Sequence, residues 1–132
     1  MDLPDLPLFA MLRTRMRWLN QRQDVLAQNV ANADTPAYVA RDLRALDFDK
    51  ALKGETGAGA LTVTNPRHIA ITPTQTGAFE DYQTPDQEST PDGNAVSLEA
   101  EMIKVSDTQA QFQAAANIYA KTMSMMRTAI GH

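Results

Sequence analysis

Few side chains in this sequence are suited to catalysis. His68 and His132 are the two imidazoles that could act as a base near neutral pH. Asp47 and Asp49 lie two residues apart, but a carboxylate pair supports acid–base chemistry only where a cleft brings both groups to one substrate. The sequence contains no glycine-rich phosphate loop, paired-histidine metal motif or nucleophile elbow. We therefore predict that the protein is not an enzyme and that it uses no cofactor, metal ion or small-molecule substrate.

Composition narrows the range of partners. The 132 residues include 12 basic and 16 acidic residues, for a formal net charge of -4, so the basic face that nucleic-acid binding requires is not expected. Cysteine is absent, which excludes disulfides and thiolate ligands. Met123, Met125 and Met126 could offer sulfur to a soft metal ion, but methionines at helical spacing favour adaptable packing. Acids and prolines between Met1 and Asp5 do not match a cleavable signal peptide, so any export is expected without N-terminal cleavage.

One amphipathic helix is predicted from Leu8 to within a turn of Asn32. Pro7 fits the first helical turn, and the residue before Pro36 is pushed out of the α region. Positions that are mostly apolar alternate in spacing of three and four, which indicates a coiled-coil seam with one polar member. The seam consists of Phe9, Leu12, Met16, Leu19, Gln23, Leu26, Val30 and Ala33. The charged residues beside it are expected on solvated flanks: Arg13, Arg15, Arg17, Arg22 and Asp24.

A second, longer helix is predicted from Leu98 to Ile130. Ser97 is suited to be its N-cap, and Glu99 and Glu101 place negative charge where the helix dipole favours it. At 1.5 Å per residue this helix would be roughly 50 Å long. Its seam also has one polar member, and it consists of Leu98, Met102, Val105, Gln109, Phe112, Ala116, Tyr119, Met123, Met126 and Ile130. Two such seams indicate helices that pack along other helices.

The middle of the chain has weaker patterns. Tyr38–Lys53 spaces its large apolar residues too irregularly to decide between a short helix and an extended segment. Residues 54–60 are predicted to form a glycine-rich loop. Residues 61–64 and 68–72 alternate with the period of a β-strand, which predicts a small hairpin or two extended pieces. Residues 84–94 are predicted to be a polar, extended linker.

The predicted fold class is mainly α, with long N- and C-terminal helices that form a coiled-coil layer and an irregular middle segment containing short β pieces. The corresponding parts of the chain are residues 1–36, 37–94 and 95–132. Two helices alone bury little surface, so further helices from neighbouring copies or related chains are expected to complete the packing. Gln23 and Gln109 either find buried partners and fix the register of the seams, or lie wet at their edges.

Three stretches resemble the flagellar rod and hook proteins. The first is residues 22–43, and its core consists of Asn29, Ala31, Asn32, Thr35, Pro36 and Tyr38. The second, residues 92–102, is similar to the family's entry into its C-terminal helix, and the third is residues 65–69. The continuation through residues 40–43 resembles the proximal-rod members in particular. Ala37 departs from the pattern, because the family usually has glycine there, and a positive φ would strain an alanine.

The resemblance implies a structural subunit of the flagellar basal body, located in the periplasmic rod after type III export. It implies that the terminal helices pack into a tubular coiled-coil layer that lines the export channel and carries torque. The expected partners are copies of the chain, other rod subunits, the junction of the rod with the membrane ring, and the export gate. The predicted assembly interface is Leu12, Met16, Leu19, Gln23, Leu26, Val30, Leu98, Met102, Val105, Gln109, Phe112, Tyr119, Met123 and Met126. The predicted signature turn is Asn29, Asn32, Thr35, Pro36 and Tyr38, where polar side chains can hydrogen-bond the backbone as the chain leaves the helix.

Two alternatives stay open at this point. The chain could be another small rod subunit of the same class. Leu8–Leu19, with arginines close by, could instead lie on a membrane surface. Membrane-surface helices bury a broad apolar face, whereas this seam is narrow and continues over several heptads, so packing against helices is favoured.

Overall fold

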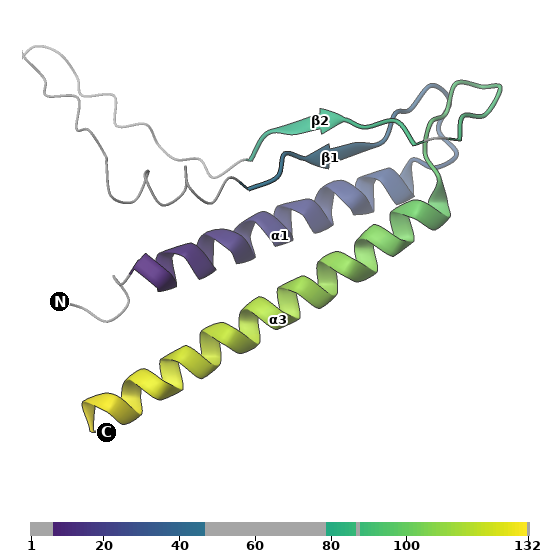
Figure 1. Cartoon of the computed structure of the whole chain (residues 1–132). Coiled ribbons are helices and arrows are strands. Elements are labelled where there is room, and N and C mark those ends of the chain that lie inside the picture. Colours follow the sequence, from purple (N-terminus) through teal and green to yellow (C-terminus); the bar gives the residue numbers. More distant parts are fainter. Residues whose placement is uncertain (1–6, 47–78, 87, 132) are drawn as a thin grey trace, which may run out of the picture.

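The computed structural model describes residues 7–46, 79–86 and 88–131 (Figure 1). In chain order, the elements are helix α1 (Pro7–Ala31), strand β1 (Arg41–Leu43), strand β2 (Asp81–Gln83) and helix α3 (Leu98–Ile130). The mainly helical fold class is therefore confirmed. The predicted glycine-rich loop, the period-two segments 61–64 and 68–72, and the candidate groups His68, His132, Asp47 and Asp49 all lie outside the described residues.

The two helices form an antiparallel hairpin (Figure 1). Near the start of α1, the ring of Phe9 meets the ring of Tyr119 edge to face, with 5.4 Å between the centroids. Near its end, Asn29 hydrogen-bonds Glu101 in the first turn of α3. Because α3 has 33 residues and α1 has 25, the last turns of α3 extend past the Phe9–Tyr119 contact.

The helix ends follow the local sequence. The Ser97 side chain accepts a hydrogen bond from the Ala100 N–H, which confirms Ser97 as the N-cap of α3. Gly131 closes the same helix in the left-handed conformation, with φ 77°, and donates its N–H to the Thr128 carbonyl. α1 ends at Ala31, within the predicted turn of Asn32.

A short antiparallel strand pair lies along α1 on the side away from α3 (Figure 1). The register pairs Arg41 with Gln83 and Leu43 with Asp81. Part of the segment that the sequence left undecided is therefore extended, while β2 was not predicted at all. Gln21 fixes the entrance to β2, because its side-chain amide donates to the Phe79 carbonyl and accepts from the Phe79 N–H, both at 2.9 Å.

The core lies where α1 meets the strand pair and the middle of α3. It consists of Trp18, Leu19, Val25, Leu43 and Ala115, with Met16, Leu46, Phe79 and Phe112 packed around it. α1 therefore buries two faces, one against α3 and one against the strands. This second face was not visible in the seam pattern, because a single a/d stripe describes contact with one partner only.

Arg22 belongs to that second face, so its predicted place on a solvated flank is wrong. Its guanidinium forms a bidentate pair with Asp42, with both N···O distances 3.0 Å, and the two side chains are 17% and 13% exposed. The same guanidinium lies 5.5 Å from the centroid of the Trp18 ring. β1 supplies the carboxylate, and the sequence pattern of α1 alone cannot show that partner.

Candidate functional site

The predicted interface residues of α1 all lie on or beside its packed surface. Leu19 and Leu26 are fully buried, and the remaining members are half-buried: Leu12, Met16, Gln23 and Val30. Phe9 is fully buried too. The apolar side chains that a membrane-surface helix would insert into lipid are therefore largely covered within the chain itself. No helix among the described residues is long and apolar enough to cross a bilayer.

α3 packs on α1 through a line that differs from the predicted seam. Its buried residues are Glu101, Thr108 and Ala115, which are spaced by seven and lie one position before Met102, Gln109 and Ala116. Within the predicted seam, five interface members are half-buried: Val105, Phe112, Tyr119, Met123 and Met126. Leu98, Met102 and Gln109 are exposed. Helix α3 is therefore rotated about its axis so that part of the predicted seam is covered by the rest of the chain and part is exposed to solvent.

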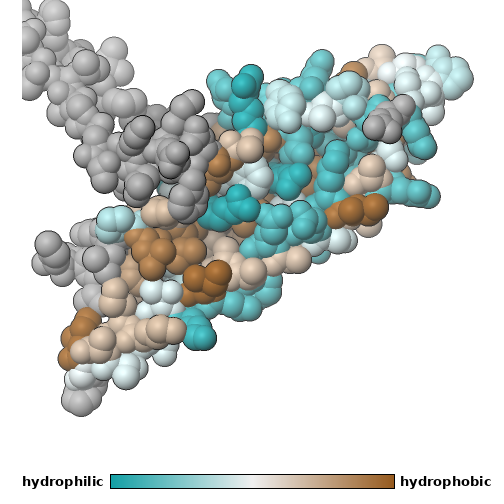
Figure 2. All heavy atoms as spheres, in the orientation of Figure 1, coloured by the Kyte–Doolittle hydropathy of each residue, from teal (hydrophilic) through white to brown (hydrophobic). Residues whose placement is uncertain are grey.

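Large apolar side chains in both halves of α3 are uncovered, and we refer to them together as the apolar row. Each of them is at least 50% exposed: Leu98, Met102, Ile103, Ile118, Met125 and Ile130. Figure 2 shows apolar surface gathered over the part of the helix pair that contains the start of α1 and the end of α3. These side chains form two groups, with Leu98, Met102 and Ile103 at the start of α3 and Ile118, Met125 and Ile130 in its second half.

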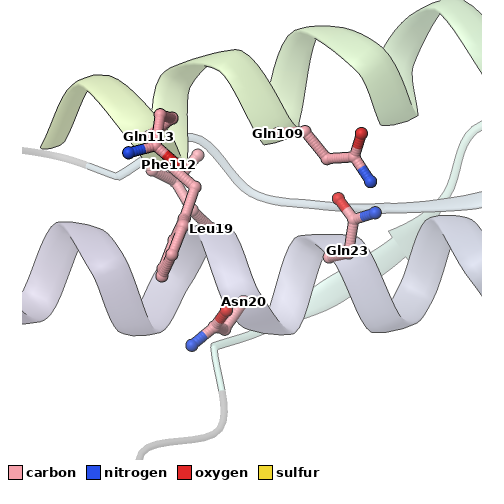
Figure 3. Close-up of a pocket in the computed structure, with 6 residues that line it drawn as sticks. All are labelled: Leu19, Asn20, Gln23, Gln109, Phe112 and Gln113. Carbon is pink, nitrogen blue, oxygen red and sulfur yellow. The ribbon is translucent and has the colours of Figure 1, made fainter. Parts of the chain in front are cut away.

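Gln23 and Gln109 line a groove between the helices, together with Leu19, Asn20, Phe112 and Gln113 (Figure 3). The groove has a volume of about 340 Å³. The two amides point toward one another from opposite helices in Figure 3, with Gln23 half-buried and Gln109 exposed. Neither glutamine is fully buried, so both amides lie at the solvent-exposed edge of the seam.

Asn29 is the centre of the signature turn, and its side chain is fully buried. Its amide nitrogen donates to the Arg41 carbonyl at 2.7 Å and to Glu101 Oε2 at 2.8 Å. Its amide oxygen accepts from the Arg41 N–H at 3.0 Å and from the Tyr38 hydroxyl at 3.2 Å. One side chain thereby joins α1, β1 and α3, which explains why a residue with both a donor and an acceptor is needed at this point.

A second layer of amides closes the turn. Asn32 donates to the Gln28 carbonyl at 2.8 Å and accepts from the Thr35 hydroxyl at 3.0 Å, as the sequence predicted for short polar side chains there. Asn94, which is 2% exposed, donates to the backbone carbonyls of Asn32 and Thr35 at 3.0 and 2.6 Å. The Ala95 N–H donates to the Tyr38 carbonyl at 2.9 Å. The linker thus contributes a buried anchor that the sequence analysis missed, although Asn94 lies inside the second resembling stretch.

Pro36, the remaining residue of the predicted turn, is exposed, and Tyr38 is half-buried.

Glu101 lies in the first turn of α3, as predicted, and it has a further role there. Its carboxylate is fully buried and bonded on both oxygens, to Asn29 and to Lys104 Nζ at 2.7 Å. Lys104 also lies 3.4 Å from Asp86, whose other oxygen accepts from the Ser97 N–H at 2.7 Å. Burial lowers the pKa of Lys104, but its contacts with the two carboxylates outweigh that effect, and the pKa lies above its ordinary value. The start of α3 is therefore fastened by paired charges rather than by a dipole effect alone.

Ala37 is the one non-glycine residue with a positive φ in the described part of the chain, at 59°. It faces Gly93, which has φ 84°, and its N–H donates to the Asp92 carbonyl at 3.1 Å. The sequence predicted strain at Ala37 if φ were positive, and the backbone has that conformation. An alanine in this region costs about 1–2 kcal/mol.

Ala37→Gly is expected to raise the free energy of unfolding by about 0.5–1 kcal/mol, because relieved strain exceeds the extra entropy of glycine in the unfolded chain. Urea denaturation, followed by the fluorescence of the single tryptophan, measures this. Gly93→Ala is the matched control and is expected to destabilise the protein, because it places a second Cβ at positive φ. A destabilising Ala37→Gly would contradict the assignment of strain to this turn.

The helix hairpin, its hydrogen-bonded turn and its uncovered apolar row define the chain as a structural subunit of an assembly built from helices. A family model described as flagella basal body rod protein matches residues 12–38, which hold most of α1 and the signature turn. Proteins named FlgB match 80% of the chain at 41 and 43% identity, and the chain therefore belongs to the FlgB family of flagellar basal body rod proteins.

The alignments with relatives cover most of this chain and most of each relative. The flagellar basal body rod protein FlgB of Salmonella typhimurium is 41% identical over 117 residues, which are 80% of this chain and 82% of the relative. The Escherichia coli protein of the same name is 43% identical over 119 residues, with the same two shares. FlgB of Agrobacterium fabrum is 29% identical over 130 residues, which are 95% of this chain and 93% of the relative. The resemblance is confirmed, and the protein is a structural component of the flagellar basal-body rod.

Proposed function

We propose that the chain builds the proximal rod by packing the outer face of α3 against helices of neighbouring subunits. The observation that supports this most directly is the uncovered apolar row on α3, which a single chain has no further helix to cover among its described elements. A hairpin of two helices and a short strand pair buries little apolar surface, so covering this row adds stability that the chain alone lacks.

Copies of the chain and other rod subunits are the proposed occupants of that face. The proposal extends to the junction of the rod with the membrane ring and to the export gate as neighbours of the rod. Helices interlocked in this way would carry torque along the rod and enclose the export channel. It assigns the protein no catalytic step and no cofactor.

The interface predicted from the sequence has two parts in this proposal. The buried and half-buried members are assigned to the packing of the hairpin itself, and they are those of α1 together with Val105, Phe112, Tyr119, Met123 and Met126. Leu98 and Met102 lie on the outward part and are available to another subunit. The same seam thus serves contacts within one chain and contacts between chains.

The test compares one exposed and one buried position. Met102→Asp is expected to change the free energy of unfolding by no more than about 0.5 kcal/mol, because half of the side chain is already in water. The same variant, in a strain lacking the wild-type gene, is expected to give basal bodies without rods in electron micrographs. Leu26→Asp, at a fully buried position, is expected to lose both the fold and the rod.

Met102→Leu is the matched control, because it keeps the apolar surface and should give normal rods. Normal rods with Met102→Asp would contradict the proposal that this face of α3 is an interface.

A further inference from the structure

The rotation of α3 about its own axis is not the one that apolar burial alone would select. One residue corresponds to roughly 100° around a helix. Rotating α3 by about this angle would bring Met102, Gln109 and Ala116 toward α1 in place of Glu101, Thr108 and Ala115. The observed rotation leaves Met102 50% exposed and buries Glu101 completely. Both features cost free energy, so another contact must offset them.

Asn29 provides that contact, and its own position is already fixed. Three hydrogen bonds to the Arg41 backbone and the Tyr38 hydroxyl hold the amide, and none of them involves α3. Its N–H therefore points in one direction, 2.8 Å from Glu101 Oε2. Lys104, one turn further along α3, neutralises the other carboxylate oxygen from the same helix. Few positions of α3 satisfy this geometry, because both the axial register and the rotation must bring the carboxylate to Asn29.

We propose that the Asn29–Glu101 contact is a rotation lock, which turns α3 so that Leu98, Met102 and Ile103 face outward. Glu101 acts as a positioning residue: it touches no partner, yet it decides which apolar side chains remain for one. Buried polar contacts in helix pairs are best attested in this role, where they fix register at a cost in stability. The value of the lock for assembly rests on the proposed function, whereas the rotation itself is a property of the isolated chain.

The chain has no cysteine, so single introduced thiols report the rotation against a clean background. Thr108→Cys places a near-isosteric thiol on the buried line, at a position that is 1% exposed, and Met102→Cys places one on the exposed face. The reaction of each thiol with a maleimide is measured on dilute monomer. With Asn29 and Glu101 intact, the thiol at 108 is expected to react at least about tenfold more slowly than the thiol at 102, since it requires local opening.

Two variants then remove the lock. Glu101→Ala deletes the carboxylate, and Asn29→Asp sets a second carboxylate against it. In both backgrounds the thiol at 108 is expected to react faster and the thiol at 102 more slowly. Opposite changes identify a rotation, because unfolding would accelerate both thiols together.

The combination of Asn29→Asp with Glu101→Gln is the rescue. It restores one donor and one acceptor across the helices with their roles exchanged, so the wild-type order of rates should return even though the Arg41 carbonyl loses its donor. Three results would overturn the proposal: equal protection of the two thiols in the wild-type background, acceleration of both thiols in the variants, or no rescue. Because all rates come from the monomer, a failure of rod assembly alone leaves this result intact and counts against the proposed interface instead.

Discussion

Asn29→Ala is expected to lower the free energy of unfolding by about 3–5 kcal/mol, which is the usual cost of leaving one member of a buried charged network without its partner. Four hydrogen bonds end on this side chain, and all of them disappear. Among the described residues, the fully buried Glu101 carboxylate then keeps Lys104 as its one hydrogen-bond partner. A single hydrogen bond to water-exposed groups would cost only about 1 kcal/mol.

Urea denaturation of the purified monomer, followed by circular dichroism, gives this free energy. Asn32→Ala is the matched control three residues away, because it removes two hydrogen bonds that lie in an exposed setting. We expect a loss of about 1 kcal/mol from that variant. Equal losses from the two variants would show that Asn29 is not the centre of the turn.

Trp18→Ala is the second substitution with a large expected effect, again about 3–5 kcal/mol. The ring is 6% exposed and belongs to the core cluster. Arg15 and Arg22 place their guanidinium groups 5.0 and 5.5 Å from its centroid, and the indole N–H donates to the Arg44 carbonyl at 2.9 Å. Removing the ring opens a cavity between α1 and the strand pair, and the residue after β1 loses its attachment to the helix.

Hydrogen exchange separates these two consequences of Trp18→Ala. The β1 amides, at Arg41–Leu43, should lose protection more than the amides in the middle of α3. Trp18→Phe keeps most of the packing and loses the indole hydrogen bond, so its expected cost is about 1–2 kcal/mol. Unchanged protection of β1 in the alanine variant would show that the strand pair is held by other contacts, such as the Arg22–Asp42 pair.

The regular elements were predictable because their signals are local. The α3 bounds, its Ser97 cap and the end of α1 near Asn32 depend on capping, on proline and on neighbouring backbone groups, all of which are read within a few residues. The strain at Ala37 was predicted in another way, from the glycine that the family usually has at this position. The signature turn was recognised as a group of polar residues, but its buried partners, Asn94 and Glu101, lie about 60 to 70 residues away in sequence.

The prediction for Glu101 was correct about its place in the first turn of α3 but did not include its burial or its partner Asn29. The helix dipole stabilises an acidic residue in the first turn whether the side chain points to water or to the core. What buries it here is a donor on another helix, and no pattern around Glu101 indicates that donor. Arg22 on α1 is a similar case. Its carboxylate partner, Asp42, lies in β1, and the irregular spacing of apolar residues in that segment did not predict a strand pair.

By itself, the sequence determined that this protein consists of two long seam-bearing helices with an irregular middle segment between them, and through its motifs it determined the family. Periodicity and capping suffice for that, because they express how a backbone satisfies its own hydrogen bonds and how apolar side chains recur on one face. Only the tertiary structure decided which face of α3 turns inward. That choice depends on one amide and one carboxylate meeting between helices, and it leaves Met102 and Ile103 outside, where another subunit can cover them.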